Sequence, residues 1–354
     1  MSDASARFVA VYLPQFHPIA ENNDWWGEGF TEWTNVARAR PLYDGHHQPN
    51  LPGALGFYDL RLAETREAQA ELAAGAGIEA FCYWHYWFAG RRMLERPFGE
   101  VLEHGTPRFG FCLAWANQHW STIWTGGRAL LVEQTYPGPD DHARHFEAVL
   151  PALRDERYFR VDGRPLFFVY RPADLPDAST FVDQWRTLAD RAGLPGLYLV
   201  GESKGGWRAA DAGFDAGTHP TLYDLLPTPR LPGPVGHRLE RTLRRRPKRH
   251  PYEDFARRPM PRCHSPHPEL PTVLPNWDNT PRFGRHGFVL TGSTPELFEE
   301  AVRTAIDATT DLPAEERIVF LKSWNEWAEG NYLEPDRRFG DAYLRRLASV
   351  ANGR

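Results

Sequence analysis

The sequence predicts a single α/β domain, a (β/α)₈ TIM barrel with long βα-loop insertions that spans residues 1–354. Three observations predict this fold. Apolar runs of strand length alternate with helical patterns along the chain. The runs are continuously apolar, which is typical of parallel strands buried on both faces. Eight such units in a chain of about 350 residues favour closure into a barrel.

The predicted elements follow one another as strand, then helix. The predicted strands are Phe8–Leu13, Ala80–Trp84, Phe109–Trp115, Leu166–Tyr170, Leu197–Val200, Phe214–Thr218, Thr272–Pro275 and Ile318–Leu321, of which the sixth and seventh have the weakest patterns. The predicted helices are Ala63–Ala76, Met93–His104, His142–Leu153, Ser179–Ala192, Pro295–Ala308 and Gly340–Val350. Gly77 and Gly193 follow two of them, as C-terminal glycines often do. Ser293 or Thr294 is placed to cap the helix that begins at Pro295.

A doubly wound open sheet is the alternative architecture. It predicts a glycine-rich phosphate loop after an early strand. The first strand is followed instead by Pro14–Pro18, and no G-x-G-x-x-G or Walker sequence stands at a strand–helix junction. The closed barrel is therefore preferred, and no cofactor is predicted.

One segment interrupts the alternation. Residues 220–270 are rich in Pro, Arg and His and include the basic run Arg241–Arg249. A solvated loop insertion is the ordinary interpretation, because charge runs usually face water. The alternative is a basic lid over an anionic polymer or a lipid-linked glycan. No internal repeat or second domain is evident.

Composition excludes several classes of function. The formal net charge of −5 argues against attraction of the whole chain to nucleic acid or an anionic membrane. No apolar stretch approaches 18 residues, so no membrane span is expected. Met1–Arg7 is short and polar and does not read as a signal peptide. Cys82, Cys112 and Cys263 lack metal-type spacing and fit a reducing compartment, so a cytoplasmic location is predicted. Oligomeric state is not indicated.

Aromatic residues make up 13% of the chain, and their positions are informative. A large aromatic core would explain the number alone. However, eleven of the thirteen tryptophans fall where a strand ends: Trp25, Trp26, Trp33, Trp84, Trp87, Trp115, Trp120, Trp124, Trp277, Trp324 and Trp327. In a barrel the active site lies at these carboxyl ends. Sugar rings stack on aromatic faces, so the positions favour a carbohydrate groove.

The predicted substrate-binding residues come from these strand ends. They are Tyr12, Gln15, His17, Trp26, Glu32, Trp33, Tyr83, His85, Trp87, Trp115, Asn117, Trp120, Tyr170, Glu202, Trp277, Asp278, Arg282, Trp324 and Asn325. Histidines such as His17, His85 and His119 could be imagined as metal ligands. No H-x-H or H-E-x-x-H spacing supports that idea, so they are expected to bind sugar hydroxyls or loop backbone, and no metal is predicted.

Glu326 and Glu329 are the predicted catalytic carboxylates. They follow the eighth strand and are three residues apart. On a helical turn this spacing puts their Cβ atoms about 5–6 Å apart, which suits a retaining glycosidase better than an inverting one. Neighbouring Trp324 and Trp327 could desolvate one carboxyl and raise its pKa. A structural role, as a loop cap or an arginine partner, is the alternative. Arg171 follows the fourth strand with no carboxylate beside it, which argues against an acid placed there.

The same stretches resemble the WbsX-like family, whose members are labelled glycosyltransferases and which is related to glycoside hydrolase family 99. The matching stretches are Tyr12–Pro18, Gly29–Val36, Phe81–Phe88, Trp115–Asn117, Trp277–Arg282, Trp324–Gly330 and Leu333–Pro335. The resemblance implies a (β/α)₈ barrel and endo action on mannose-like or related bacterial glycans. Pro14–Pro18 and Gly29–Val36 are typical of WbsX-like chains and not of the hydrolases.

The resemblance also implies roles for the two carboxylates. Glu326 looks like a base and Glu329 like the general acid/base. In family 99 the base takes the proton of the sugar's own 2-hydroxyl, which attacks C1 to give a 1,2-anhydro intermediate that water then opens. This route needs a 2-hydroxyl trans to the leaving group.

Three functions remain open from the sequence. The first is a retaining hydrolase of a bacterial polysaccharide or O-antigen. The second is a glycosyltransferase or transglycosylase in cell-surface polysaccharide biosynthesis, such as lipopolysaccharide. The usual D-x-D is not evident, because Asp140-Asp141 lacks the spacer residue. The third is a non-catalytic glycan-binding protein, which would be favoured if Glu326 and Glu329 lay far from any pocket. An oligosaccharide or polysaccharide partner is expected in all three.

Overall fold

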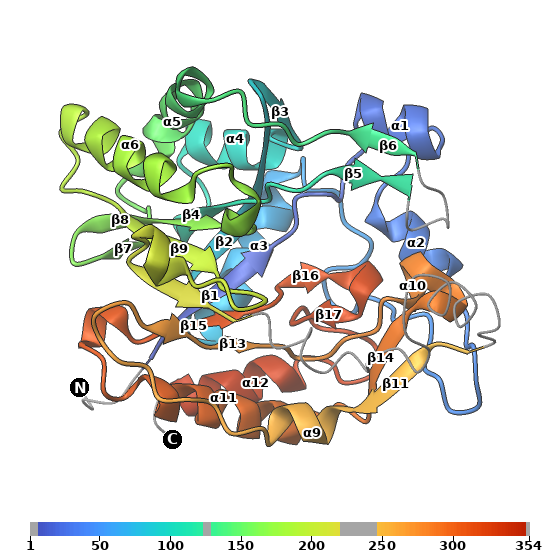
Figure 1. Cartoon of the computed structure of the whole chain (residues 1–354). Coiled ribbons are helices and arrows are strands. Elements are labelled where there is room, and N and C mark those ends of the chain that lie inside the picture. Colours follow the sequence, from blue (N-terminus) through green and yellow to red (C-terminus); the bar gives the residue numbers. More distant parts are fainter. Residues whose placement is uncertain (1–5, 123–128, 220–245, 352–354) are drawn as a thin grey trace.

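The computed structural model describes residues 6–122, 129–219 and 246–351. Its centre is a ring of parallel strands surrounded by helices (Figure 1), which confirms the predicted TIM barrel. In order around the ring the strands are β1 (Arg7–Tyr12), β2 (Ile78–Phe88), β4 (Gly110–Trp115), β8 (Arg164–Val169), β9 (Tyr198–Glu202), β10 (Ala216–Thr218), β12 (Glu269–Leu270) with β13 (Thr272–Val273), and β15 (Ile318–Leu321).

The seventh position of the ring is one strand interrupted by a proline. On one side of Pro271, β12 pairs with β10, and on the other side β13 pairs with β15. Pro271 has no N–H to give to a ladder, but its carbonyl accepts a hydrogen bond from the Phe320 amide at 3.0 Å. The barrel therefore closes through a strand of two short halves, which explains the weak sequence signal here.

Helices cover the outside of the barrel. They are α3 (Ala63–Gly75), α4 (Arg96–His104), α5 (Pro139–Arg154), α6 (Ala178–Arg191), α11 (Pro295–Thr309) and α12 (Ala342–Ala351). Short 3-10 helices lie between them, namely η2 (Pro172–Asp174), η3 (Ala209–Ala212) and η5 (Ala314–Glu316). The Thr294 side chain accepts a hydrogen bond from the Leu297 amide and caps α11, which confirms one of the two predicted caps. None of the described helices is long and apolar enough to cross a membrane.

One predicted helix begins too early. The chain over 93–104 was predicted as a single helix. Instead, β2 continues to Phe88, turns through Ala89 and Gly90, and returns as β3 (Arg91–Met93). Both turn residues have positive φ, 47° and 93°. This tight turn reverses the chain, so α4 starts only at Arg96.

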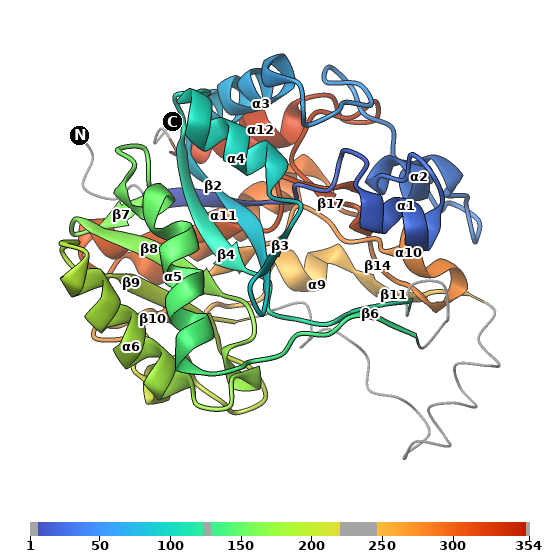
Figure 2. The same cartoon turned by 90° about the horizontal axis from the view of Figure 1, so that it is seen from above.

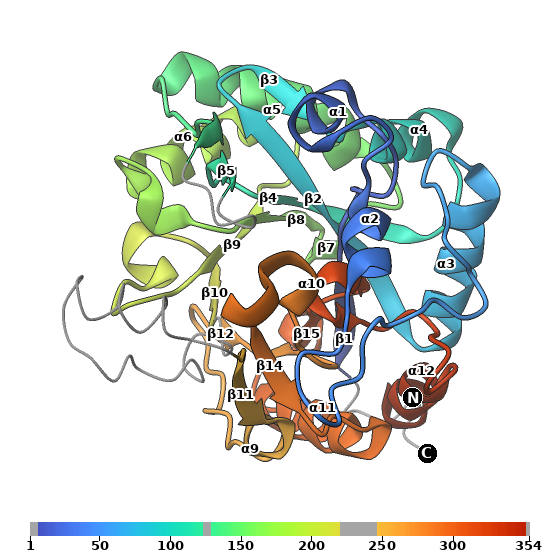
Figure 3. The same cartoon turned by 90° about the vertical axis from the view of Figure 1, so that its right-hand side faces the viewer.

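The loops after the strands build the mouth of the barrel (Figures 2 and 3). After β1 they carry α1 (Ala20–Trp26) and α2 (Glu32–Arg38), and after β4 the hairpin of β5 (Trp120–Ser121) with β6 (Leu130–Val132). Further loop elements are α10 (Thr280–Phe283), η4 (Gly284–His286), β16 (Asn325–Glu326), η6 (Trp327–Glu329) and β17 (Asn331–Tyr332), while β7 (Arg160–Val161) forms a hairpin with β8. Figure 3 shows α10 crossing in front of the barrel opening.

The predicted insertion over 220–270 is only partly described. Residues 220–245, with most of the basic run, lie outside the described residues. The remainder packs against the barrel. Strand β11 (Lys248–Pro251) pairs in parallel with β14 (Phe288–Thr291), and α9 (Tyr252–Ala256) packs against α11.

Candidate active site

The two predicted catalytic carboxylates lie in the loop after β15. Glu326 ends β16, which pairs with β17, and Glu329 ends the 3-10 turn η6. The expected helical turn is therefore wrong in detail, since the spacing spans a strand end and a 3-10 turn. Gly330 closes the turn with φ 59°, and a Cβ there would lie 2.8 Å from that of Asp278. Only glycine fits this position, and it holds the loop against the wall of the barrel mouth.

Both carboxylates bind the guanidinium of Arg282. Its Nη1 lies 2.6 Å from Oε1 of Glu329, and its Nη2 lies 3.4 Å from Oε2 of Glu326. A third carboxylate, Glu32 on α2, contacts Nη2 at 3.1 Å and Nε at 3.2 Å. The Arg282 side chain is only 7% exposed and Glu32 is fully buried. One cation thus fixes three acids that come from the loops after the first and eighth strands.

Burial and like charge set the electrostatics of Glu326. Burial, and then the neighbouring Glu329, raise the pKa of Glu326 to about 7, although Arg282 and Lys322 act in the opposite direction. Trp84 Nε1 donates a hydrogen bond to Oε1 of Glu326 at 3.1 Å and orients the carboxyl group. A carboxyl group whose pKa is close to neutral can either accept or donate a proton at physiological pH.

Two adjoining cavities open beside these carboxylates. The larger, of about 310 Å³, is lined by Glu329, Arg282, Trp277, Tyr170, Glu202 and Lys322 among others. The smaller, of about 100 Å³, is lined by Gln15, Trp84, Tyr86, Trp120, Glu326 and Glu329 among others. We refer to them together as the catalytic cavity. It combines apolar aromatic faces with a few charged groups, as small-molecule sites commonly do.

Comparison with known proteins gives the family. The sequence profile of the family described as Glycosyltransferase WbsX matches residues 8–347. The chain belongs to the WbsX family. It is 39% identical over 356 residues to WxcX, an uncharacterized protein of Xanthomonas campestris pv. campestris strain B100, and equally so to WxcX of strain ATCC 33913. The match covers 96% of this chain, which spans about half the length of those relatives (48%).

Solved structures share the fold of this WbsX-family chain. A protein described as glycoside hydrolase-like gives a TM-score of 0.57 at 15% identity, covering 98% of this chain and 94% of its own. The GH99 endo-alpha-mannosidase from Bacteroides thetaiotaomicron gives a TM-score of 0.57 at 15% identity, covering 100% of this chain and 98% of its own. At this identity the likeness shows the fold alone. The resemblance read from the sequence motifs is confirmed.

Successive side chains of a strand point to opposite faces, and this alternation decides which residues of the WbsX-family chain face the catalytic cavity. Residues that line it at the strands or their ends are Val11, Leu13, Gln15, Cys82, Trp84, Tyr86, Phe168, Tyr170, Thr272, Leu274, Phe320 and Lys322. The residues between them face the helices. Of the predicted substrate-binding residues, Gln15, Trp120, Tyr170, Glu202, Trp277 and Arg282 are among those that line the cavity.

Several predicted substrate-binding residues are instead buried beneath the helices. Tyr12 donates its hydroxyl hydrogen to Gln69 on α3, and Tyr83 packs against Phe98 on α4. His85 shares a hydrogen bond of 2.9 Å with His145 on α5, and burial lowers the pKa of His85 to about 3. This histidine pair is therefore neutral and belongs to the packing layer, so the prediction that His85 binds sugar does not fit its position.

Trp87, Trp115 and Asn117 also require correction. Trp87 stacks on His145 and donates to Asp141. Trp115 is buried and donates to the Trp87 carbonyl. Asn117 is fully buried and binds both the amide and the carbonyl of Arg171, so it ties the loop after β4 to the loop after β8. These side chains support the site from behind.

The Trp324–Asn325 segment has a similar supporting role. Trp324 is fully buried, and Asn325 exchanges two hydrogen bonds with the backbone of Leu13, which fastens the catalytic loop to the end of β1. Trp33 donates to the Tyr58 carbonyl within the core. None of the three is among the residues that line the catalytic cavity.

The other placements differ from one residue to the next. The Asp278 carboxylate points away from the catalytic cavity and accepts hydrogen bonds from His46, Gln48 and Thr280. His17 is buried. Trp26, the last residue of α1, is half-buried and packs against Phe30. Neither is among the residues that line the catalytic cavity. Glu32 acts through Arg282.

The side chains that line the catalytic cavity but were not selected from the sequence include Trp84, Tyr86, Gln118 and Lys322. Lys322 Nζ lies 5.4 Å from the ring centre of Tyr170. Trp84 and Tyr86 lie in the second half of β2, Lys322 directly follows β15, and all three have the parity that faces inward. Gln118 lies in the loop after β4. Alternation read along β2 from Cys82 and along β15 from Phe320 was the signal that could have found Trp84, Tyr86 and Lys322.

Glu334 is a further residue of this loop. It is fully buried and accepts hydrogen bonds from Tyr58, Gln69 and Trp327. Burial raises its pKa to about 7. These bonds fix Trp327, which lies between the two catalytic candidates, so Glu334 holds the catalytic turn from below. Among the described residues, no group of three or more His, Cys, Asp or Glu side chains could hold a metal ion.

Proposed function

We propose that this protein is a retaining glycoside hydrolase that cleaves within a bacterial polysaccharide, with Glu326 and Glu329 as its catalytic pair. One observation supports this most: two carboxylates share one buried guanidinium beside an aromatic-lined cavity. Glycoside cleavage needs two carboxyl groups that flank the scissile bond, one of which protonates the leaving oxygen. The tryptophan and tyrosine faces of the cavity suit a pyranose ring.

The proposed reaction follows the family 99 pattern. Glu326 removes the proton of the sugar's 2-hydroxyl, whose oxygen attacks C1. The bond from C1 to the leaving oxygen breaks, and Glu329 protonates that oxygen. In the second step Glu329 removes a proton from water, the water oxygen attacks C1, the bond between C1 and O2 breaks, and O2 takes its proton back from Glu326. Both carboxylates end in their starting states, and the anomeric configuration is retained.

Arg282 sets the balance between the two acids in this proposal. Its short contact with Glu329 and longer contact with Glu326 leave Glu326 the less compensated of the two. A base with a pKa near 7 is strong enough to polarise a hydroxyl, and about half of it is ionised at neutral pH. Glu202 and Lys322, across the cavity, are placed to bind hydroxyls of the sugar.

The pH profile tests the role of Glu326. Its raised pKa, about 7, means that the carboxyl is neutral below that pH. A base must be ionised, so kcat/KM should fall about tenfold per unit as pH drops below 7. The measurement is kcat/KM between pH 5 and 9 on one cleaved glycan. An activity that falls instead as pH rises through 7 would assign the proton-donor role to Glu326.

Trp277→Ala tests the sugar-stacking wall. Trp277 lines the catalytic cavity, and loss of one aromatic face should raise KM about 2- to 10-fold with a smaller change in kcat. Trp26→Ala is the matched control, because Trp26 is half-buried on α1 and is not among the residues lining that cavity. Equal KM values for wild type and Trp277→Ala would remove Trp277 from the sugar subsites.

A transferase or transglycosylase is the second candidate, favoured by the family's description as glycosyltransferases. The same carboxylate pair could pass the sugar to an acceptor hydroxyl in place of water. The deciding experiment incubates the protein with α-mannans, rhamnans, furanose polymers and bacterial O-antigens and sizes the products. Shortened chains that require both glutamates support hydrolysis, and their sizes distinguish endo from exo action. Transfer from an activated donor without cleavage would overturn the hydrolase proposal.

A further inference from the structure

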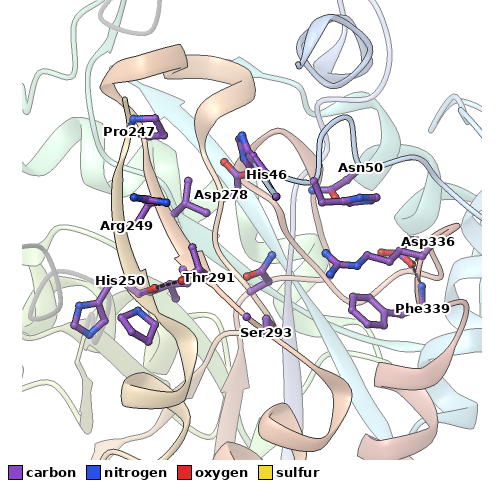
Figure 4. Close-up of a pocket in the computed structure, with 18 of the residues that line it drawn as sticks. His46, Asn50, Pro247, Arg249, His250, Asp278, Thr291, Ser293, Asp336 and Phe339 are labelled. Carbon is purple, nitrogen blue, oxygen red and sulfur yellow. Dashed lines mark hydrogen bonds and ion pairs between the residues drawn. The ribbon is translucent and has the colours of Figure 1, made fainter. Parts of the chain in front are cut away.

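A second and larger cavity, of about 640 Å³, is separated from the catalytic cavity by one wall. Figure 4 shows residues that line this second cavity. The wall is the segment 276–279 together with β14. Trp277 and Asn279 line the catalytic cavity, whereas Asn276 and Asp278 line the second one. Gly330 packs against Asp278, and the Asp278 amide donates a hydrogen bond to the Glu329 carbonyl at 2.6 Å. We call this space the outer cavity.

Two arginines in the outer cavity have no acidic partner among the described residues. Arg249, on β11, lies with its guanidinium carbon 4.6 Å from the ring centre of Tyr43. Arg338 lies 4.7 Å from the ring centre of Phe339. Figure 4 places Phe339 and Asp336, which flank Arg338 in the chain, across the cavity from Arg249. A guanidinium packed on a ring keeps its N–H edge free for a carboxylate or phosphate.

The two carboxylates of the outer cavity are already satisfied. Asp336 accepts hydrogen bonds from the Tyr332 hydroxyl and from the amides of Arg338 and Phe339. Asp278 accepts from His46, Gln48 and Thr280. Neither takes its hydrogen bonds from an arginine side chain. The Asn276 side-chain oxygen is buried without a hydrogen-bond partner among the described residues, so it is a further open polar group.

The aromatic rings of the outer cavity do not form a slot for a flat base. Tyr43 is stacked on His46 with ring centres 4.4 Å apart at 6° and also faces Arg249. Tyr332 is stacked on Trp327 at 3.7 Å. Recognition here must therefore depend on charge and hydrogen bonds, which fits a hydroxyl-rich anion better than a nucleotide.

We propose that the outer cavity binds an acidic stretch of glycan, with carboxylates of its sugar residues held by Arg249 and by Arg338 and a hydroxyl donating to Asn276. This site is non-catalytic. It rests on the proposed function only in that the ligand is a glycan. Because the two cavities share a wall in which Asp278 contacts Gly330 and the Glu329 backbone, the outer site would hold an anionic polysaccharide beside the scissile bond.

Direct binding tests the proposal. An oligogalacturonide is titrated calorimetrically into the protein, and its carboxyl-reduced, neutral counterpart is the matched ligand. The acidic oligosaccharide should bind about 10-fold or more tightly than the neutral one, because charge-assisted hydrogen bonds are the stronger class. Arg249→Gln and Arg338→Gln should each remove that preference. Arg191→Gln, an exposed arginine at the end of α6, should retain it.

Separate titrations with inorganic phosphate and a nucleoside diphosphate distinguish the source of the anion. Stronger binding of the nucleoside diphosphate, lost in Arg249→Gln, would overturn the acidic-sugar assignment. Equal binding of acidic and neutral oligosaccharides, or a preference unchanged in both variants, would also overturn it. The same titration with Glu329→Gln protein separates this site from the hydrolase proposal, since the preference should persist whether or not the glycan is cleaved.

Discussion

Glu329→Gln should remove most of the hydrolytic activity while leaving the fold intact. The amide keeps the size of the side chain and one acceptor for Arg282, but it has no proton to give to a leaving oxygen. General acid catalysis contributes on the order of 10²–10⁴-fold, so a loss of that size in kcat is expected. The measurement is kcat on the natural glycan, with the melting temperature and circular dichroism recorded alongside.

A substrate with an activated leaving group separates the acid role from a structural one. An aryl glycoside of the same sugar, with a nitrophenol leaving group, needs little protonation. The Glu329→Gln variant should therefore recover much of its first-step rate on this substrate, whereas Glu326→Gln should not. Glu71→Gln, an exposed change on α3, is the control and should match the wild type. Full activity of Glu329→Gln on the natural glycan would rule out the acid role.

Arg282→Met should destabilise the protein more than any single change at the carboxylates. The substitution preserves most of the apolar stem but leaves Glu32, Glu326 and Glu329 together without their cation. Breaking a buried ion pair by removing one partner costs about 3–5 kcal/mol of unfolding free energy. Denaturant unfolding at pH 8 measures this cost, and activity should be lost with it.

The pH dependence of that loss identifies its cause. Without Arg282 the pKa values of the buried carboxyl groups should rise further, so their neutral forms are favoured in the folded protein. The destabilisation should therefore be largest at pH 8 and smaller at pH 5. Adding Glu32→Gln to Arg282→Met should recover part of the stability. A cost that is equal at both pH values and unaffected by Glu32→Gln would indicate lost packing rather than uncompensated charge.

The barrel, and the position of Glu326 and Glu329 beside a cavity at its mouth, were predictable from the sequence for clear physical reasons. Buried parallel strands must be continuously apolar, and the motif around Glu326 and Glu329 is compact enough to recognise in one stretch. The seventh strand, which consists of β12 and β13 on either side of Pro271, was difficult to predict, because neither half is long enough to show a pattern of apolar residues. The grouping of Glu32 with Arg282 could not be read either, since it depends on loops far apart in the chain.

The selection of substrate-binding residues was less successful because it considered whether a residue stands at a strand end, but not which face of the strand its side chain points to. Trp87 and Trp115 stand at strand ends, as expected, but their parity turns them toward α5. Trp84 and Tyr86, three residues and one residue before Trp87, have the opposite parity and face the catalytic cavity. The concentration of tryptophans at one end therefore serves two purposes, since some rings line the site and others fill the layer beneath it.

The bridge from Glu32 to Arg282 spans 250 positions of the chain. A growing polypeptide leaves the ribosome N-terminus first, so Glu32 emerges long before the arginine that neutralises it and the two carboxylates that share it. A nascent chain therefore cannot assemble this cluster of one arginine and three carboxylates until almost all of the barrel has been synthesised. Under the proposed function, incomplete products of translation would be inactive, and activity would report only on chains that had reached the eighth strand and closed the ring.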